Sequence, residues 1–529
     1  MTAAIVLLAA LSTSSPESAP PATKPVARAE KPRDARAVRA RYDAVESKRM
    51  AALVSEVIRF PTVAGNADAY EKQKAWLARV GAELGLVVKD LGKVTEVDLP
   101  GPEGAPVLGL VVHGDVQPVE EAAWSVPPFE GAVKDGKILG RGAADDKGPL
   151  VQALLAMKSL REAGPKRTHT VRLLVGSDEE SANTDMETYL KDHRPPHLSL
   201  VLDSAFPVVV GEKAWQALSV TAPFGEPPRD ARGLAYEVDE LDAGLAPSIV
   251  PDRARIVLRR KGNGPSFEAL LAKLRKKTLR PGTRLEAVDR GDTAEIMVRG
   301  RSAHAGVNIE GGRNALVSLA DVLEGELPAC GADDLLSFAR RAGRDLAGTG
   351  LSLAASDPIW GRHDVNVATL QAGDGVFGHV SGLAKGKART LTINIRRIPV
   401  LSGADLKSRL YALVDEVNAS TGARLSTSGF FGDEPKVFDP EAKLVKRLLA
   451  AYRRGTGKDA PPAISGGGTY AKRLPDAIAF GMWFPGKPYP GHDVDEQMEI
   501  ADLHRGVHVL LEALVDLATG APLEKPLAP

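Results

Sequence analysis

The stretch VLGLVV, residues 107–112, is a continuous apolar run that ends directly before His113. Similar runs lie at residues 171–175 and 198–202, and a helical pattern of apolar residues at 150–160 separates the first two runs. Short apolar strands that alternate with helices are typical of a mostly parallel sheet, because both faces of such a sheet are covered. The sequence therefore predicts an α/β fold with a mixed, mostly parallel sheet and helices on both faces.

The residue pattern changes twice further along the chain. Between about residues 213 and 399, the strands mix charged and apolar residues and are separated by polar loops with Gly and Pro. Helical and apolar-strand patterns return after Gly403. We therefore expect one α/β domain formed by residues 35–212 and 400–529, interrupted by an inserted α+β domain at residues 213–399.

The first 34 residues differ in composition from the rest. An apolar run from Ile5 to Leu11 fits the core of a secretory signal, although the usual preceding positive residues are missing. The Ser, Pro and Ala residues that follow are typical of a flexible linker. A disordered start with chance hydrophobicity is the alternative. No later segment has about 18 uninterrupted apolar residues, so we expect a signal-like segment and linker at 1–34, no membrane span in the mature chain, and a periplasmic or secreted location.

Composition excludes two kinds of function. The 68 basic and 68 acidic residues of the 529-residue chain cancel, so no basic excess is present to neutralise nucleic-acid phosphates. The single cysteine, Cys330, excludes an intrachain disulfide framework and a thiolate-rich zinc site. We therefore expect no nucleic-acid partner.

Histidine and acidic residues gather at or just after the ends of the predicted strands. The segments are HGD at 113–115, AADDKG at 143–148, GSDEES at 176–181 and GHDVDE at 491–496, and Asp203 follows the run at 198–202. In an open α/β sheet, ligands bind outside the carboxyl ends of the strands, so these side chains should converge. Each segment alone also fits a surface loop or a helix N-terminus with acidic residues.

The residue types of these segments indicate which metal they would bind. Two histidines and several carboxylates without a thiolate suit zinc above all, with Mn²⁺ or Co²⁺ as substitutes. A carboxylate that bridges two ions would hold them roughly 3.5–4 Å apart. In the acidic turn, one Glu could bind a metal while its neighbour acts as general base. The loop before Thr469 exposes backbone, so we expect Gly467 and Gly468 to contact the substrate.

Eight longer motifs make the sequence similar to a known family. They are VVHGDVQPV, WSVPPFEG, GRGAADDKGP, GSDEES, LDSAFPVVVGEKA, SAHAGVNIEGGRNAL, GGGTYAKRLP and GHDVDE, in this order between residues 111 and 496. The chain resembles the M20 family of metallopeptidases and, within it, the Xaa-His dipeptidase (PepV-like, carnosinase-related) branch. The resemblance covers most of the mature chain, and the GRGAADDKG and GGGTYAK strings are long and specific.

The resemblance implies two zinc ions per chain and names their ligands. These are His113 and Asp203 for one ion, Glu180 and His492 for the other, and Asp145 as the bridge. Asp115 would orient His113, and Glu179 would take a proton from the bridging water and pass it to the leaving amine. A cis peptide bond is expected at Asp145–Asp146.

The resemblance also implies that the inserted domain is a lid. His304 matches the lid histidine that stabilises the oxyanion, and Arg396 matches the arginine that binds the free carboxylate of the substrate. The strand at 391–396 gives an independent reason to prefer Arg396 to Arg397, because Arg396 falls on its polar face. Ser248 stands where the family often has Asn, which leaves the details of specificity open.

These expectations predict a dinuclear zinc dipeptidase that hydrolyses dipeptides with a free C-terminal carboxylate through a metal-bridging hydroxide. An M20-type amidohydrolase that acts on N-acyl amino acids is the alternative within the family, because both substrates offer a carboxylate and an amide. A catalytically idle binding protein on the same fold is a third hypothesis, and the complete ligand set argues against it. The long insertion favours a monomer with a small peptide substrate, and leaves a homodimer with a shared lid histidine open.

Overall fold

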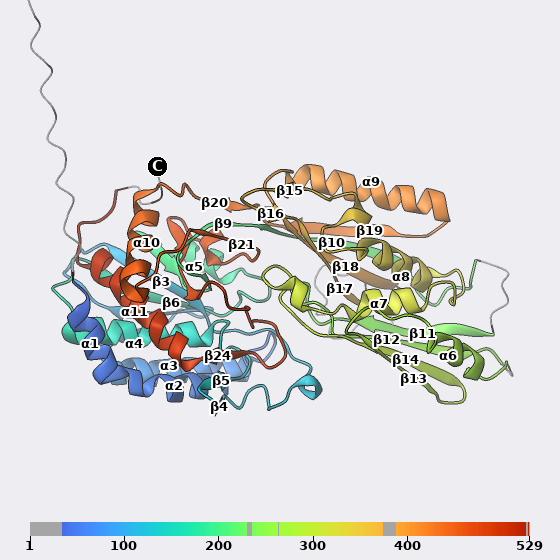
Figure 1. Ribbon diagram of the computed structural model, residues 1–529, viewed down its shortest axis with the longest axis horizontal. Helices are drawn as coiled ribbons and strands as arrows, with labels where there is room; N and C mark the ends of the chain where they lie inside the picture. Colours follow the sequence, from blue (N-terminus) through green and yellow to red (C-terminus); the bar gives the residue numbers. More distant parts are fainter. Residues whose placement is uncertain (1–33, 230–234, 263, 374–387, 525–526, 528–529) are drawn as a thin grey trace, which may run out of the picture. The chain divides into compact units, whose positions relative to one another are not determined.

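Two large sheets organise the chain, one of six strands and one of eight. We call the parts built on them the six-stranded lobe and the eight-stranded lobe (Figure 1). The computed structural model describes residues 34–229, 235–262, 264–373, 388–524 and 527. Of the signal-like segment and linker expected at 1–34, residues 1–33 lie outside the described residues.

The six-stranded sheet has the strand order β1-β2-β6-β3-β7-β22. Its strands are β1 (Val87–Asp90), β2 (Val94–Leu99), β3 (Val107–His113), β6 (Thr170–Gly176), β7 (Leu198–Val201) and β22 (Ala477–Ala479). The pairs β3–β6, β3–β7 and β7–β22 are parallel, whereas β1–β2 and β2–β6 are antiparallel. The three apolar runs form β3 and its two neighbours, and the expected mixed, mostly parallel sheet is confirmed.

Helices cover both faces of this sheet. Alternate residues of a strand point to opposite faces, so an apolar strand presents an apolar surface on each face for helices to pack against. Leu110 and Val112 of β3 belong to one hydrophobic core, and Val111 belongs to another. The helices of the first core are α1 (Arg36–Ala44), α2 (Met50–Ile58), α3 (Ala67–Leu84), α4 (Lys147–Ala163), α10 (Lys443–Thr456) and α11 (Ile500–Ala518). The second core contains α5 (Asp185–Asp192) and the short helix η5 (Tyr470–Lys472).

The loop before α4 carries the GRGAADDKG motif. Gly140 and Gly142 have φ angles of 152° and 94°, which glycine adopts without steric cost. The Asp145–Asp146 peptide bond is cis, as expected from the resemblance. The helix begins at Lys147, directly after this bond, so the loop ends where the helix packs against the sheet.

The eight-stranded sheet is antiparallel throughout, with the order β13-β14-β12-β11-β17-β18-β10-β19. Its strands are β10 (Ala214–Pro223), β11 (Tyr236–Ala243), β12 (Arg253–Arg260), β13 (Arg284–Asp289), β14 (Thr293–Arg299), β17 (Asp364–Ala372), β18 (Ala388–Arg397) and β19 (Ser426–Gly432). The helices α6 (Glu268–Leu274), α7 (Ala315–Val322), α8 (Gly331–Ala342) and α9 (Gly403–Thr421) contribute to its core. An inserted α+β lobe is therefore present.

The eight-stranded lobe extends beyond residue 399, where we expected the inserted domain to end. After β18, helix α9 joins the core of this lobe and β19 pairs with β10. The chain returns to the six-stranded lobe at β20 (Lys436–Val437), which pairs with β9 (Val209–Glu212). Apolar periodicity indicates the type of an element but not the sheet that it joins. The sequence pattern therefore does not show that residues 403–432 belong to the eight-stranded lobe. The division of the chain into domains itself stays a prediction.

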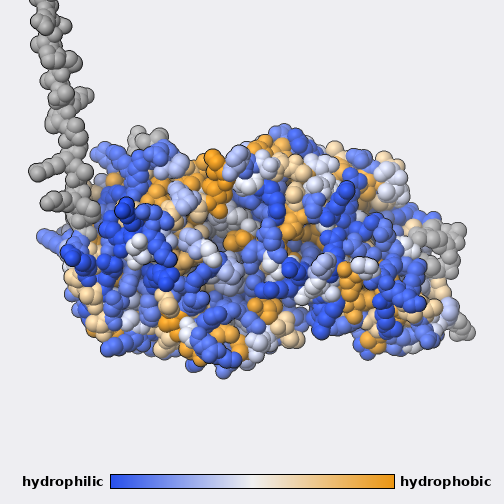
Figure 2. Space-filling view, in the orientation of Figure 1, coloured by the Kyte–Doolittle hydropathy of each residue, from blue (hydrophilic) through white to orange (hydrophobic). Residues whose placement is uncertain are grey.

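Short strands complete the six-stranded lobe. These are β4 (Ala132–Lys134), β5 (Lys137–Leu139), β8 (Ser204–Ala205), β21 (Ala463–Ser465), β23 (Met482–Trp483) and β24 (Gln497–Glu499). The face of the molecule in Figure 2 is largely hydrophilic, with hydrophobic residues scattered over it. In the described ranges of the chain, no helix is both long enough and apolar enough to cross a membrane.

Candidate active site

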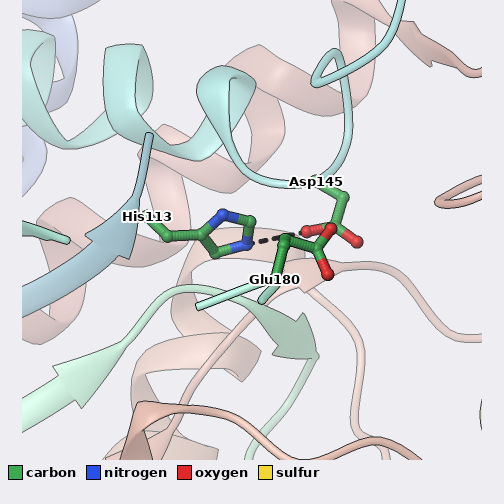
Figure 3. A group of neighbouring side chains, drawn as sticks. All are labelled: His113, Asp145 and Glu180. Atoms are coloured by element: carbon green, nitrogen blue, oxygen red, sulfur yellow. Dashed lines mark hydrogen bonds and ion pairs between the residues drawn. The ribbon is translucent and has the colours of Figure 1, made fainter. Parts of the chain in front are cut away.

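The carboxyl ends of β3, β6 and β7 bring the predicted site residues together. β3 ends at His113, the acidic turn with Glu180 follows β6, and Asp203 follows β7. Ligand atoms of His113, Asp145 and Glu180 lie within 4.8 Å of one another (Figure 3). Those of His113, Asp146 and Asp203 do so as well. Each group is a candidate metal site.

Asp145 lies between two histidines. Its Oδ1 is 2.8 Å from Nε2 of His113, and its Oδ2 is 3.2 Å from Nε2 of His492. Nε2 of His492 is also 2.9 Å from Oε1 of Glu180, and Nε2 of His113 is 3.9 Å from Oδ2 of Asp203. The five side chains expected as ligands therefore lie together, and Asp145 lies between the pair His113 and Asp203 and the pair His492 and Glu180.

The chemistry of this cluster fits divalent metal ions. Burial and the negative charge of Asp145 raise the pKa of Asp203 well above its usual value, and burial raises the pKa of Asp146 in the same way. Oδ1 of Asp146 is buried and has no hydrogen-bond partner among the described residues. Buried carboxylates this close together require protons or cations to neutralise them. Imidazole and carboxylate ligands without a thiolate suit zinc and related ions.

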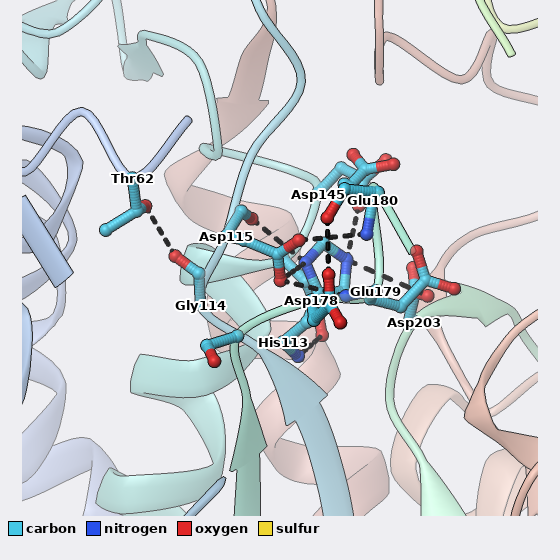
Figure 4. Close-up of polar contacts among 12 residues, drawn as sticks. Thr62, His113, Gly114, Asp115, Asp145, Asp178, Glu179, Glu180 and Asp203 are labelled. Carbon is cyan, nitrogen blue, oxygen red and sulfur yellow. Dashed lines mark hydrogen bonds and ion pairs between the residues drawn. The ribbon is translucent and has the colours of Figure 1, made fainter. Parts of the chain in front are cut away.

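Asp115 holds two parts of the site in place. Its main-chain oxygen lies 3.0 Å from Nδ1 of His113, closer than its Oδ1 at 3.6 Å. Its carboxylate accepts hydrogen bonds from the main-chain N–H groups of Glu179, at 3.3 Å, and Glu180, at 2.9 Å (Figure 4). The carbonyl of Asp115 therefore makes the closer contact with His113, whereas its side chain fastens the acidic turn.

Glu179 lies in this turn beside the expected metal ligands. Nδ2 of Asn183 donates a hydrogen bond to its Oε1 at 3.3 Å. Burial raises the pKa of Glu179 well above its usual value, and the negative charges of Glu180 and Asp115 act in the same direction. A carboxyl group whose pKa is raised in this way is suited to proton transfer near neutral pH.

His304 reaches the site from the eight-stranded lobe of the same chain. Its ring centroid lies 4.5 Å from that of His492. Its Nδ1 accepts hydrogen bonds from the main-chain N–H groups of Gly306, at 2.9 Å, and Val307, at 3.0 Å. Burial lowers the pKa of His304 well below its usual value, so the ring is neutral and carries its proton on Nε2. His304 is therefore a hydrogen-bond donor at Nε2.

Arg396 is a buried cation on β18, with an exposed fraction of 2%. Its Nε donates to Oδ1 of Asn394 at 3.0 Å, and its Nη2 donates to Oγ of Ser248 at 3.1 Å. Burial lowers its pKa to about 10. Among the described residues, no carboxylate lies within ion-pair distance of Arg396, whereas Arg397 pairs with Glu434. Arg396, on the polar face of β18, therefore lines a cavity, whereas Arg397, on the opposite face, has an ion-pair partner.

Two cavities meet at the acidic turn. The larger, of about 510 Å³, is lined by Arg396, and the smaller, of about 140 Å³, is lined by Asp145, Asp203 and Gly467. Residues that line both cavities are Glu179, Glu180, His304, Gly468, Thr469 and His492. The substrate-binding residues expected from the sequence therefore all line one or both of these cavities.

The structure adds residues to the site whose roles the sequence did not indicate. Oη of Tyr489 donates to Oδ2 of Asp145 at 2.7 Å, and Nε2 of Gln117 donates to Oε2 of Glu180 at 2.8 Å. Asp146 accepts a hydrogen bond from the main-chain N–H of His113 at 3.1 Å. Gln117 and Asp146 lie inside quoted motifs and Tyr489 lies just before GHDVDE. Proximity to a motif was the available signal, and it does not tell which way a side chain points.

The fold and the site are those of a metal-dependent hydrolase, because histidine and carboxylate ligands converge at strand ends beside a cavity. The chain belongs to the peptidase family M20/M25/M40, whose family model matches residues 109–516. It is therefore a metallopeptidase, and the family and enzyme class predicted from the sequence are confirmed.

Relatives and solved structures agree with this assignment. YtjP of Bacillus subtilis (strain 168) is 30% identical over 79% of this chain and 84% of its own length. The β-Ala-Xaa dipeptidase of Lactobacillus delbrueckii subsp. lactis is 28% identical over 87% of this chain and 91% of its own length. Human carnosine dipeptidase 1 shares the fold, with a TM-score of 0.58 at 13% identity, over 92% of this chain and 99% of that chain.

Proposed function

We propose that this metallopeptidase is a dinuclear zinc dipeptidase that hydrolyses dipeptides with a free C-terminal carboxylate. The observation that carries the proposal is the buried Arg396, which lines the same cavity as Glu179 and His304. A buried guanidinium with no carboxylate partner among the described residues favours an anionic ligand. The similarity to a β-Ala-Xaa dipeptidase over most of both chains supports a dipeptide as that ligand.

The cluster around Asp145 would hold the two ions. His113 and Asp203 would bind one ion, His492 and Glu180 the other, and Asp145 both, because one of its oxygens faces each histidine. When bound, the ions would polarise the scissile carbonyl and lower the pKa of a bound water. The same ligands would accept Mn²⁺ or Co²⁺ in place of zinc.

The side chains around the ligands would then transfer protons, stabilise the developing negative charge and bind the substrate carboxylate. Glu179 lines both cavities, so it would take a proton from the attacking water and deliver it to the leaving amine. Nε2–H of His304 would donate to the carbonyl oxygen as negative charge develops there. Arg396 would fix the substrate by a charge-assisted contact with its carboxylate.

The test compares a free dipeptide with its N-acetylated form. Amino-acid release is measured with the zinc-reconstituted protein, with and without a chelator. We expect cleavage of the free dipeptide alone, lost with the chelator and restored by zinc. Cleavage of only the acetylated form would transfer the function to hydrolysis of N-acyl amino acids. If the zinc-loaded protein cleaved neither substrate, the binding-protein hypothesis would replace the dipeptidase.

We also propose that the protein is exported and acts as a monomer. The signal-like pattern at residues 1–34 supports export. The short distance between His304 and His492 of the same chain supports a lid that needs no second subunit. Light scattering should give the mass of one chain, and fractionation of expressing bacteria should place the protein in the periplasm or the medium. A dimer mass or cytosolic retention would contradict the respective proposal.

A further inference from the structure

The two residues of a bound dipeptide would lie in two cavities of different volume, an inference that rests on the proposed dipeptidase function. Arg396 lines the larger cavity, of about 510 Å³, and does not line the smaller one, of about 140 Å³. A carboxylate held by Arg396 therefore places the C-terminal residue in the larger cavity. The N-terminal residue then occupies the smaller cavity, on the other side of Glu179 and His304, which line both.

An aromatic wall lies beside Arg396 in the larger cavity. Trp215 on β10 is the cross-strand partner of Arg396 on β18, and such directly opposed residues have Cβ atoms about 4.5–5.5 Å apart on one face. Nε1 of Trp215 and Nη2 of Arg396 both donate to Oγ of Ser248, at 2.9 and 3.1 Å. The ring of Phe431 packs against Trp215 with centroids 5.8 Å apart. A carboxylate at Arg396 thus brings the C-terminal side chain to this wall.

The lining around the wall includes apolar residues, and two of its charged side chains, Asp433 and Arg473, are bonded to other protein groups. The apolar residues include Val63, Ala64, Pro118, Leu245, Ala246 and Pro247. Oδ1 of Asp433 accepts from the main-chain N–H of Trp215, at 2.7 Å, and from Nζ of Lys472, at 2.8 Å. Nε of Arg473 donates to Asn183 at 3.2 Å. A bulky apolar side chain would bury its surface here, whereas a charged one would lose hydration without a new partner.

The smaller cavity limits the size of the N-terminal side chain of the substrate. Trp483 and Ile464 line it, together with the expected ligands Asp145 and Asp203. Tyr489 also lines it, and its hydroxyl is held by Asp145. A large N-terminal side chain would have to displace these lining groups, so a small one fits best.

We infer that the enzyme prefers dipeptides with a small N-terminal residue and a bulky aromatic or aliphatic C-terminal residue. Phe431 determines this specificity on the C-terminal side, because it packs against Trp215 and lines the larger cavity but is not one of the expected metal ligands.

The experiment measures kcat/KM of the zinc-loaded full chain for Ala-Phe, Ala-Gly and Phe-Ala. We expect Ala-Phe to exceed each of the others by about tenfold or more, the usual effect of burying a large apolar side chain. Phe431→Ala should lower the ratio of Ala-Phe to Ala-Gly by about tenfold. Phe430→Ala is the matched control, because Phe430 packs against the core of the eight-stranded lobe and does not line either cavity. It should leave this ratio unchanged.

Each other outcome overturns a defined part of the inference. Equal efficiency for Ala-Phe and Ala-Gly, or faster cleavage of Phe-Ala, would overturn the preference and leave the dipeptidase function standing. An unchanged ratio in Phe431→Ala would overturn the role of that residue. Failure to cleave all three dipeptides would overturn the proposed function itself. The comparison of substrates on the wild-type enzyme does not depend on the folding of any variant.

Discussion

The main-chain oxygen of Gly306, in the eight-stranded lobe, packs directly against Gly466 of the six-stranded lobe. A Cβ atom added to either glycine would overlap the main-chain oxygen of the other. Gly306 follows His304 by two residues, and Gly466 opens the loop that lines the smaller cavity. The approach of the two loops that holds His304 beside His492 therefore requires the absence of a side chain at both positions.

Gly466→Ala should separate these loops and displace His304. Because a displacement of about 1 Å can cost about a hundredfold in rate, we expect kcat/KM for a dipeptide to fall by about that factor, with zinc content unchanged. Gly311→Ala is the control, since a Cβ atom there would meet nothing closer than 3.7 Å. Full activity of Gly466→Ala, or an equal loss in the control, would contradict the role of the glycine contact.

Glu179→Gln should abolish most turnover without removing the metal. The amide keeps the size of the side chain and its contact with Asn183 but cannot accept a proton, so kcat should fall by about 10²–10⁴. Zinc content, measured by elemental analysis with zinc in excess, should stay at the wild-type level, because Glu179 is not one of the expected ligands. Glu162→Gln, on exposed surface of α4, is the matched control. A parallel loss of zinc and activity would make Glu179 a ligand rather than a base.

The central strands and the convergence of the ligands were predictable from the sequence. The apolar runs before His113, Gly176 and Asp203 indicated strands buried on both faces. Because parallel strands present their carboxyl ends at one edge, the motifs after them had to meet there. The alternation of Thr392 and Asn394 with apolar residues on β18 likewise separated Arg396 from Arg397, since the two faces of a strand have different environments.

Other features depend on tertiary contacts that no local pattern encodes. The membership of β19 in the eight-stranded sheet follows from pairing with β10, far away in the sequence. The carbonyl of Asp115, rather than its carboxylate, makes the closer contact with His113, a matter of loop conformation and rotamer. Tyr489 meets Asp145 only because two distant loops pack together. Sequence patterns therefore predict which elements form, but not these particular hydrogen bonds.

Ser248→Ala should weaken substrate binding more than turnover. The hydroxyl group of Ser248 accepts hydrogen bonds from both Trp215 and Arg396, so its loss leaves two donors without their shared acceptor and Arg396 less firmly oriented. We expect KM for a dipeptide to rise about tenfold, and kcat to change by less than about threefold. Ser248→Thr, which keeps the hydroxyl group, should restore KM. A selective loss of kcat in Ser248→Ala would contradict a role in binding the carboxylate.

Glu212 should make the stability of the protein depend on pH. It is buried at the end of β9 and accepts hydrogen bonds from the main-chain N–H and Oγ1 of Thr469, at 3.2 and 2.8 Å. Burial raises its pKa from 4.5 to about 7. The folded state thus keeps a proton that the unfolded state has lost, so this stabilisation is complete below about pH 4.5 and disappears as the pH rises through about 7.

Glu212→Gln should remove this pH dependence, because glutamine does not titrate. The free energy of unfolding of wild type should lose about 3 kcal/mol, as an upper bound, between pH 4.5 and pH 8 relative to the variant. Urea unfolding at a series of pH values measures the difference, and Glu441→Gln is the control because the Glu441 side chain is 75% exposed. Parallel pH profiles for wild type and Glu212→Gln would contradict a raised pKa at Glu212.

Removal of metal should destabilise the fold, because the carboxylates of Asp145, Asp203 and Glu180 would then repel one another in a buried cluster. Zinc at about 1,000 times its dissociation constant stabilises the folded state by about 4 kcal/mol, so a chelator should lower Tm by about 4 °C. Asp145 lies beside both His113 and His492, whereas Asp203 lies beside His113. Asp203→Asn should therefore bind one zinc per chain fewer than wild type, whereas Asp145→Asn should lose affinity for both ions. Equal zinc content in the two variants would contradict Asp145 as the shared ligand.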